Sequence, residues 1–165
     1  MNSYIQSLRE RDVIRVEMVC LGNICRSPMA AAVLANRVKE IDGPQIIVTS
    51  SGTSSWHVGE GAHQLSQETW KLAGYTHSHT ARQFTAESFD EVDLILAMDQ
   101  SNHDNILQLA RHEQDRAKVA MLRAFDPGAD SLEVPDPWGN EIGAYQEVLA
   151  MVEAAISGLL KSLRR

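Results

Sequence analysis

A strand, a tight loop and a helix follow one another near the N-terminus, and this order constrains the fold more than any other feature. Residues 13–20 are rich in β-branched side chains, which predicts a strand. Residues 21–28 form a turn, and Pro28 suits the first position of a helix with Ser27 as its N-cap. Apolar residues then recur at helical spacing until Gly43. This succession is typical of an α/β protein.

The rest of the chain continues the alternation. Further strands are predicted at residues 45–50, 92–98 and 119–125, and further helices at residues 61–72, 101–110 and 141–163. We therefore predict a single doubly wound α/β domain over residues 13–165, with a central four-stranded parallel sheet flanked by helices in a flavodoxin-like order. Residues 1–12 are expected to form a polar N-terminal leader. Residues 126–140 contain three prolines and predict a long loop of the kind that often carries function.

Composition and charge narrow the classes of function. Acidic residues outnumber basic ones by 22 to 15, which argues against nucleic acid or an anionic membrane as the main partner. The longest apolar run, residues 29–35, is far shorter than the roughly 18 residues that a membrane helix needs. Cys20 and Cys25 are too close in sequence to form a disulfide framework, which favours a reducing compartment. We expect a cytoplasmic protein that is a monomer or at most a weak dimer.

The loop between Cys20 and Arg26 has the residues of an oxyanion-binding site. It follows a strand and leads into a helix, so the backbone amides from Leu21 onward can surround an anion. Gly22 and Asn23 readily adopt the left-handed backbone conformation that a tight cradle requires. The planar guanidinium of Arg26 can bind two oxygens of a phosphate-like group. The same positive field favours the thiolate form of Cys20.

A candidate general acid lies in the long loop. A thiolate beneath a tetrahedral oxyanion is placed to attack its central atom, and the leaving group then needs a proton. Asp136, held between Pro135 and Pro137, can supply that proton. The neighbouring Trp138 can stack on an aryl group. These residues together predict the cleavage of a phosphate ester.

Several separate segments also resemble one known family, the low-molecular-weight protein tyrosine phosphatases. The segment from Val19 to Pro28 resembles the family signature residue for residue. The other matching segments are Ser51-Gly52-Thr53, Trp56-His57, Ala81-Arg82, Met98-Asp99 with Asn102, and Asp136-Pro137-Trp138. The resemblance runs from about Val13 to the C-terminal helix.

The resemblance implies a role for each site residue. It implies that Cys20 is the nucleophile, that Arg26 is the phosphate clamp, and that Asp136 is the general acid. Asp136 would later act as a base and activate water against a phosphocysteine intermediate. Ser27 would donate a hydrogen bond to the thiolate, and Asn23 would brace the loop. The residues expected to bind the phosphate are Leu21, Gly22, Asn23, Ile24, Cys25 and Ser27.

The same resemblance implies the class of substrate. Trp56 and Trp138 look like the walls of a deep slot that selects phosphotyrosine over the shorter phosphoserine. The expected partner is a tyrosine-phosphorylated protein or a small aryl phosphate, with no metal or organic cofactor, because the loop and Arg26 can stabilise the transition-state charge. The loop of residues 126–140, which carries Asp136 and is called the acid loop below, differs from that of many family members. Those members carry paired tyrosines where this chain has Trp138 and Gly139. That difference removes the tyrosines associated with regulatory phosphorylation in animal members.

Some interpretations stay open at this point. Cys25 either fills the loop or is a redox partner that forms a reversible disulfide with Cys20. Asp99 is expected to cap the next helix, and support of the loop is its second role. The histidines lack the companions of a zinc motif, so no metal site is predicted.

Three other functions compete with tyrosine phosphatase activity. In the family that this chain resembles, activity on phosphoarginine is associated with threonine at the position of Ile24, so the resemblance implies that Ile24 favours phosphotyrosine. A thioredoxin-coupled arsenate reductase needs cysteines beyond Cys20 and Cys25. A non-catalytic phosphate sensor would bind phosphate analogues without releasing inorganic phosphate.

Overall fold

Four parallel strands form the sheet at the centre of the protein. The computed structural model describes residues 2–165. The strands are β1 (Val13–Cys20), β2 (Gln45–Gly52), β3 (Leu94–Ala97) and β4 (Val119–Met121). They follow the order β2-β1-β3-β4, which confirms the predicted flavodoxin-like sheet. Because β1 lies between β2 and β3, Cys20 ends an interior strand at the carboxyl edge of the sheet, where ligands bind in such folds.

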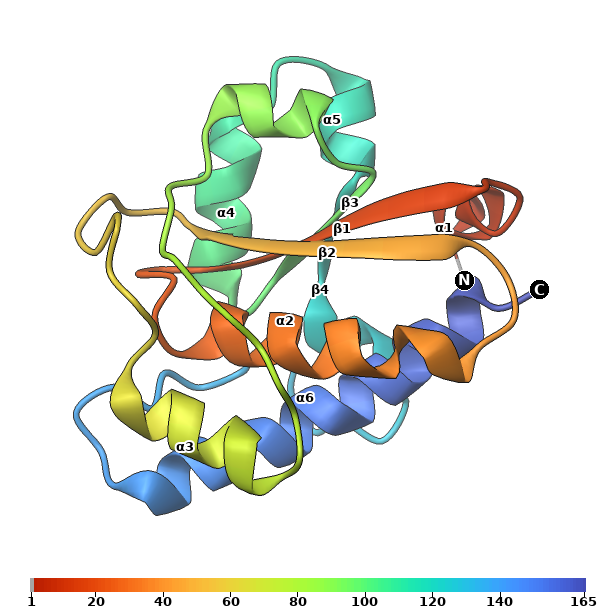
Figure 1. Cartoon of the computed structure of the whole chain (residues 1–165). Coiled ribbons are helices and arrows are strands. Elements are labelled where there is room, and N and C mark those ends of the chain that lie inside the picture. The colour runs from red at the N-terminus through yellow and green to blue at the C-terminus, as the bar shows by residue number, and fades with distance from the viewer. Residues whose placement is uncertain (1) are drawn as a thin grey trace.

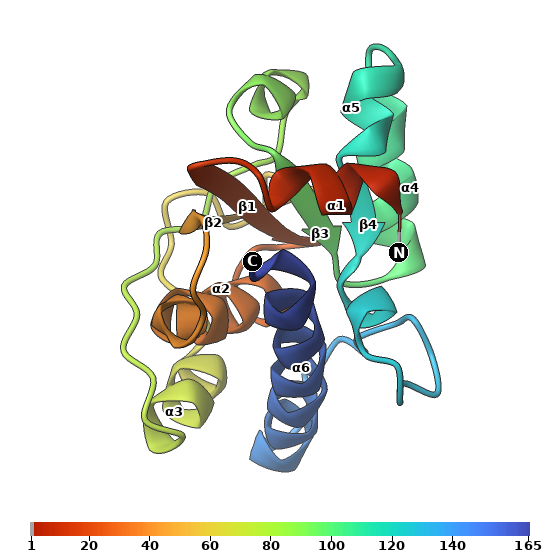
Figure 2. The same ribbon diagram turned by 90° about the vertical axis from the view of Figure 1, so that its right-hand side faces the viewer.

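Helices lie on both sides of this sheet, as predicted for a doubly wound domain. Figures 1 and 2 show α2, α3 and α6 on one side, and α4 and α5 on the other. The helices are α1 (Ser3–Leu8), α2 (Arg26–Arg37), α3 (Gln64–Leu72), α4 (Gln100–Leu109), α5 (Glu113–Ala117) and α6 (Ile142–Leu163), with 3-10 helices η1 (Val38–Glu40), η2 (Ala86–Asp90) and η3 (Leu122–Phe125). Among residues 2–165, no helix is both long and apolar enough to cross a membrane.

Two apolar clusters hold β1 from its two faces. Successive strand residues point to opposite faces, so Met18 and Val19 enter different clusters. The cluster around Met18 includes Ile156 of α6, and the cluster around Val19 includes Ile106 of α4. All four side chains are fully buried, and burial of such a side chain contributes roughly 1.5–3 kcal/mol. The strand that carries Cys20 is therefore fixed from both sides.

The start of α2 differs from the sequence prediction. The helix begins at Arg26 with Cys25 as its N-cap, so the prediction that Ser27 is the cap is wrong. The hydroxyl of Ser27 contacts the sulfur of Cys20 and the amide of Asn23 instead of an orphan amide of the helix. Pro28 therefore lies in the first turn but not at its first position, and its missing N–H still costs nothing there.

A short helix occupies the segment that was expected to be a polar leader. Asn2 caps α1 by accepting hydrogen bonds from two backbone amides of the first turn. Ile5 and Leu8 of α1 are buried, and the helix packs against α6. Tyr4, Ile5 and Leu8 span little more than one helical turn, which is too short to reveal a helical period in the sequence.

The fourth predicted strand is shorter than the expected 119–125. It stops at Met121, and the chain continues as η3. This 3-10 turn lies directly against α6, because a Cβ atom on Gly158 would lie 1.7 Å from the carbonyl oxygen of Phe125. Only glycine allows the two backbones to approach so closely.

Candidate active site

The sulfur of Cys20 lies at the base of the loop that joins β1 to α2. The side chain is 2% exposed. The backbone amide of Asn23 donates a hydrogen bond to the sulfur at 3.3 Å, and the hydroxyl of Ser27 lies 3.0 Å from it. A backbone amide of the loop and a hydroxyl from the first turn of α2 therefore converge on the sulfur.

Asn23 holds the loop in its curved form. It is the one non-glycine residue with a positive φ (57°) among the described residues, as the predicted cradle requires. Its side-chain amide donates to the hydroxyls of Ser27 at 2.8 Å and Ser50 at 3.0 Å. An amide nitrogen can only donate, so the hydrogen of Ser27 is left for the sulfur of Cys20 or the carbonyl of Ser51, which lies at 3.3 Å.

The carboxyl end of β2 supports the loop from outside. The amide of Thr53 donates to the carbonyl of Cys20, and the amide of Ser54 donates to the carbonyl of Leu21, both at 2.9 Å. Gly52 lies so close to the loop that a side chain at this position has no room. A Cβ atom at this position would lie 2.6 Å from the carbonyl oxygen of Leu21.

Arg26 is a buried cation whose ends face different groups. Its Nη1 donates to Asp99 at 2.6 Å and to the carbonyl of Val134 at 3.0 Å. Its Nη2 lies 3.8 Å from the carboxylate of Asp136. Burial lowers the pKa of Arg26, but the negative charges of Cys20, Asp99 and Asp136 outweigh it and raise the pKa. The guanidinium therefore stays charged. Since Nη1 is occupied by Asp99 and Val134, Nη2 is the nitrogen that faces Asp136.

Asp99 fulfils both roles that the sequence left open. One carboxylate oxygen accepts a hydrogen bond from the backbone amide of Asn102 at 2.8 Å. The side-chain oxygen of Asn102 accepts one from the backbone amide of Asp99, and the two bonds form a capping box for α4. The other oxygen binds Arg26. Asp99 therefore orients the guanidinium from a helix N-terminus.

The acid loop places Asp136 and Trp138 at the mouth of a cavity of about 260 Å³. The carboxylate of Asp136 is 46% exposed and accepts a hydrogen bond from the amide of Trp138 at 3.1 Å. Trp56 and Trp138 are 71% and 62% exposed, so both indoles are available to a ligand. The cavity is lined by Cys20, Leu21, Gly22, Ile24, Cys25, Arg26, Trp56, His57, Asp136 and Trp138.

Cys25 differs from Cys20 in its surroundings. Its thiol lies 3.6 Å from the hydroxyl of the buried Tyr145, which in turn lies 3.5 Å from Nδ1 of His63. Burial raises the pKa of the Cys25 thiol to about 12 and also raises the pKa of Tyr145. Both cysteines are free in the structure, and Cys25 remains a thiol at neutral pH.

The cavity brings together the predicted site residues except Asn23 and Ser27, which contact the sulfur of Cys20 without lining the cavity. Sequence reasoning also missed several neighbours of these residues. His57 was noted only as part of a matching segment, yet it lines the cavity and lies 3.1 Å from Glu60. His79 is considered in the sequence only as one of the histidines that lack the companions of a zinc motif, yet its Nε2 lies 2.6 Å from the carbonyl of Asn23. Burial lowers the pKa of His79, so its neutral ring donates an N–H to that carbonyl. Ser50 carries no local signal and is found only through the fold.

Fold and site together define an α/β protein of the cysteine-dependent phosphatase class. The model of the low molecular weight phosphotyrosine protein phosphatase family matches residues 15–165. The low molecular weight protein-tyrosine-phosphatase of Streptomyces coelicolor is 44% identical over 154 residues, covering 91% of this chain and 93% of its own. The chain therefore belongs to the low molecular weight protein tyrosine phosphatase family.

Solved structures agree with this assignment. A protein tyrosine phosphatase from Entamoeba histolytica has a TM-score of 0.84 at 31% identity, with 91% of this chain and 96% of that chain covered. An arginine phosphatase from Geobacillus stearothermophilus has a TM-score of 0.78 at 32% identity, with 91% and 92% covered. The fold is thus shared by a relative named as a tyrosine phosphatase and a relative named as an arginine phosphatase.

Proposed function

We propose that this protein hydrolyses phosphate monoesters of protein tyrosine residues and of small aryl alcohols. The observation that carries the proposal is one cavity lined by Cys20, Arg26 and Asp136. Membership of the family supports a phosphorylated protein or an aryl phosphate as the substrate.

In the proposed first step, Cys20 attacks the phosphorus atom. The amides of the loop and the Nη2 side of Arg26 bind the non-bridging oxygens and stabilise the charge that develops on them. A bond forms between sulfur and phosphorus while the bond from phosphorus to the aryl oxygen breaks. Asp136 gives its proton to the departing aryl oxygen. The alcohol leaves, and a phosphocysteine remains.

In the proposed second step, Asp136 acts as a base. Its carboxylate removes a proton from water, the water oxygen attacks phosphorus, and the bond to sulfur breaks. Inorganic phosphate leaves, and Cys20 returns to the thiolate. The exposed position of Asp136 at the cavity mouth supports both of its roles, because leaving group and water enter from that side.

The aromatic rim supports selection of an aryl ester. Trp56 and Trp138 line the same cavity as Cys20, and their indoles can stack on a phenyl ring. In phosphotyrosine the phosphate is attached to a phenyl ring, and the indoles of Trp56 and Trp138 can contact that ring. A phosphoserine is shorter and offers no ring, so it would forgo this contact.

A panel of phosphate esters tests the proposal. We expect the wild type to release phosphate from p-nitrophenyl phosphate and from a phosphotyrosine peptide with EDTA present. We expect kcat/KM for the same peptide with phosphoserine to be on the order of 10²-fold lower, because the ring contacts are lost. Phosphate release measured by a colorimetric assay gives both values.

Two outcomes of this panel would overturn the proposal. Turnover confined to phosphoarginine would assign the chain to the arginine phosphatases, to one of which it is 32% identical. Binding of vanadate or phosphate without turnover of any ester would indicate a sensor. The side chain of Ile24, which lines the cavity, supports the aryl substrate over phosphoarginine, since threonine is the residue associated with the latter.

We also propose that Cys25 protects Cys20 from irreversible oxidation. Peroxide would oxidise the Cys20 thiolate to a sulfenic acid, and the Cys25 sulfur would then attack it, form the disulfide and release water. An added thiol would reduce that disulfide. The raised pKa of Cys25 leaves little thiolate at neutral pH, so the attack should accelerate as the pH rises.

A peroxide recovery experiment checks this role. After hydrogen peroxide and then dithiothreitol, we expect the wild type to regain most of its activity, whereas Cys25→Ser should regain little because Cys20 oxidises further. Recovery should be measured at pH 7 and pH 9 against untreated samples of both proteins. Equal recovery of the two proteins would contradict the role of Cys25.

The cellular setting is part of the same proposal. Two free cysteines, one of them the proposed nucleophile, support action in a reducing compartment such as the cytoplasm. We infer that the protein acts there as a monomer on proteins that carry phosphotyrosine. Sedimentation at micromolar concentration would check the oligomeric state.

A further inference from the structure

Glu17 is a buried carboxylate on the central strand, away from the cavity. Its side chain is fully buried, although interior positions of a parallel strand are usually apolar. Thr49 donates a hydrogen bond to its Oε1 at 3.0 Å, and Arg82 forms an ion pair with the same oxygen. Its Oε2 has no hydrogen-bond partner among residues 2–165. The carboxylate is therefore held from one side only, chiefly by Arg82.

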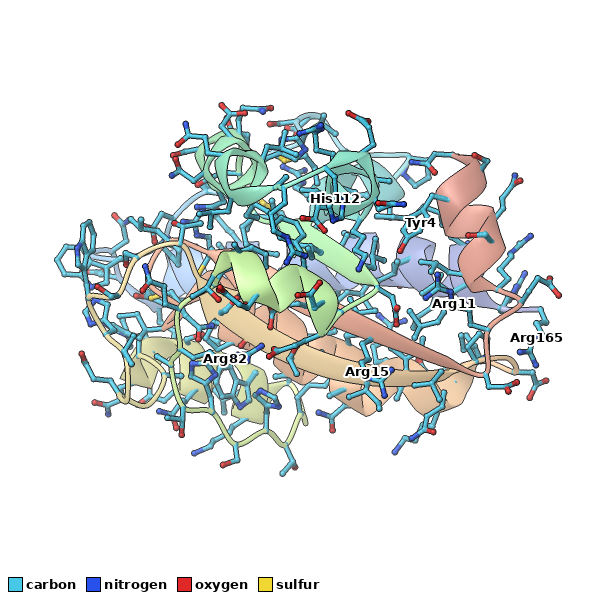
Figure 3. All side chains as sticks on the ribbon, turned by 90° about the horizontal axis from the view of Figure 1, so that it is seen from above. Tyr4, Arg11, Arg15, Arg82, His112 and Arg165 are labelled. Carbon is cyan, nitrogen blue, oxygen red and sulfur yellow. The ribbon has the colours of Figure 1, made fainter. Side chains whose placement is uncertain are left out.

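Arg82 connects this carboxylate to the back of the phosphate loop. Its backbone amide donates to the side chain of Asn23 at 3.0 Å, and its Nε donates to the carbonyl of Ser50 at 3.1 Å. Its own carbonyl accepts from the amide of Gly52 at 2.9 Å. Figure 3 shows Arg82 beside β2 in the view from above. One residue thus contacts three of the groups that shape the loop.

A short series of contacts continues from Arg82 to the reacting sulfur. The side-chain amide of Asn23 binds the hydroxyl of Ser27, and that hydroxyl lies 3.0 Å from the sulfur of Cys20. The second amide contact of Asn23 goes to the hydroxyl of Ser50. A shift of Arg82 would therefore change the placement of the groups that contact the sulfur.

The cost of burying Glu17 suggests that the ion pair serves this placement and not stability. Replacing a buried ion pair by apolar residues of similar volume is often neutral or stabilising. The side chain of Arg82 is 43% exposed, so without Glu17 its guanidinium can turn to water at little cost. What the carboxylate adds is a fixed position for the guanidinium and for the main chain next to Asn23.

We propose that Glu17 is a positioning residue for the phosphatase reaction. It fixes Arg82, and Arg82 fixes Asn23 and Ser50, so that Ser27 stays against the sulfur of Cys20. This inference rests on the function proposed above, and it adds to that function a residue on the far side of the loop that touches no substrate.

The test compares Glu17→Leu with a matched variant on the exposed side of Arg82. Glu17→Leu should lower kcat for p-nitrophenyl phosphate by about 10-fold to 100-fold, as expected for a displaced catalytic group, with KM little changed and Tm not reduced. The control is Glu91→Gln, whose carboxylate lies 3.9 Å from Arg82 and is 62% exposed. It should keep wild-type kcat. Loss of activity in both variants would contradict a specific role for the buried partner.

A double-mutant cycle shows whether Glu17 acts through Arg82. If it does, Glu17→Leu should cause no further loss in an Arg82→Met background, because the contact is already absent. Losses that multiply independently would overturn the proposal. So would wild-type kcat in Glu17→Leu. Should Glu17→Leu fail to fold, Glu17→Gln keeps the shape, removes the charge and is judged by the same measurements.

Alkylation separates this proposal from the proposed function. The rate at which iodoacetamide modifies Cys20 at pH 7, located by mass spectrometry, should fall several-fold in Glu17→Leu and stay unchanged in Glu91→Gln. This rate needs no turnover. If the wild type hydrolyses no ester, the proposed function fails, and the alkylation rate still decides the role of Glu17. An unchanged rate in Glu17→Leu would then overturn it.

Discussion

Replacing Cys20 by serine is expected to lower kcat for aryl phosphates by on the order of 10⁴-fold or more, while inorganic phosphate still binds. A serine hydroxyl is not ionised at neutral pH. Among residues 2–165, the groups in contact with the Cys20 sulfur are the amide of Asn23 and the hydroxyl of Ser27, and neither is a general base. The loop amides and Arg26 are unaffected by the change. Binding and chemistry should therefore separate.

The matched variant for this prediction is Asp136→Asn, which has nearly the same shape. It should lower kcat by about 10²-fold to 10⁴-fold, the usual contribution of a general acid. The loss should be larger for phenyl phosphate than for p-nitrophenyl phosphate, because the poorer leaving group depends more on a proton. Steady-state rates and phosphate binding followed by tryptophan fluorescence give the two measurements.

Equal losses for the two esters in Asp136→Asn would contradict the acid role and leave only a role in binding. Substantial turnover in Cys20→Ser would contradict the covalent mechanism. Circular dichroism of both variants should match the wild type, because Asp136 is half-exposed and serine is isosteric with cysteine.

The loop itself could be predicted from sequence because its information is local. A β-branched strand, a glycine, an asparagine that tolerates positive φ and a proline in the first helical turn all lie within one contiguous segment. Asp136 was found in the same way, from its flanking prolines. Each of these residues signals a backbone conformation or a chemistry without reference to the rest of the chain.

Contacts between distant segments could not be predicted in this way. Nothing in the sequence around Glu17 indicates that Arg82, 65 positions away, lies against it. The error at Ser27 has the same origin, because local propensity makes it an N-cap while the fold gives its hydroxyl to Cys20 and Asn23. Tertiary contacts overrode a local preference at the point where the site is built.

Replacing Gly52 by alanine is expected to have the second large effect on activity, because the added atom would displace the backbone of the loop. Gly52→Ala should lower kcat/KM for aryl phosphates by about 10²-fold, since a displacement of roughly 1 Å in a catalytic group can cost that much. The added Cβ atom would lie 2.6 Å from the carbonyl oxygen of Leu21 and 3.0 Å from the amide of Asn23. Both are backbone atoms that cannot rotate away, so the loop itself must move.

The control for Gly52→Ala is Gly61→Ala, in the segment just before α3. A Cβ atom on Gly61 meets nothing within 4 Å, so this variant should keep wild-type kcat/KM. Phosphate affinity should fall in Gly52→Ala, because the amides that surround the anion move together with the carbonyl of Leu21. Retained activity and affinity in Gly52→Ala would contradict this prediction, because they would mean that the end of β2 moves while the loop keeps its position. The hydrogen bonds from the amides of Thr53 and Ser54 argue against that, since they tie the residues directly after Gly52 to the carbonyls of Cys20 and Leu21.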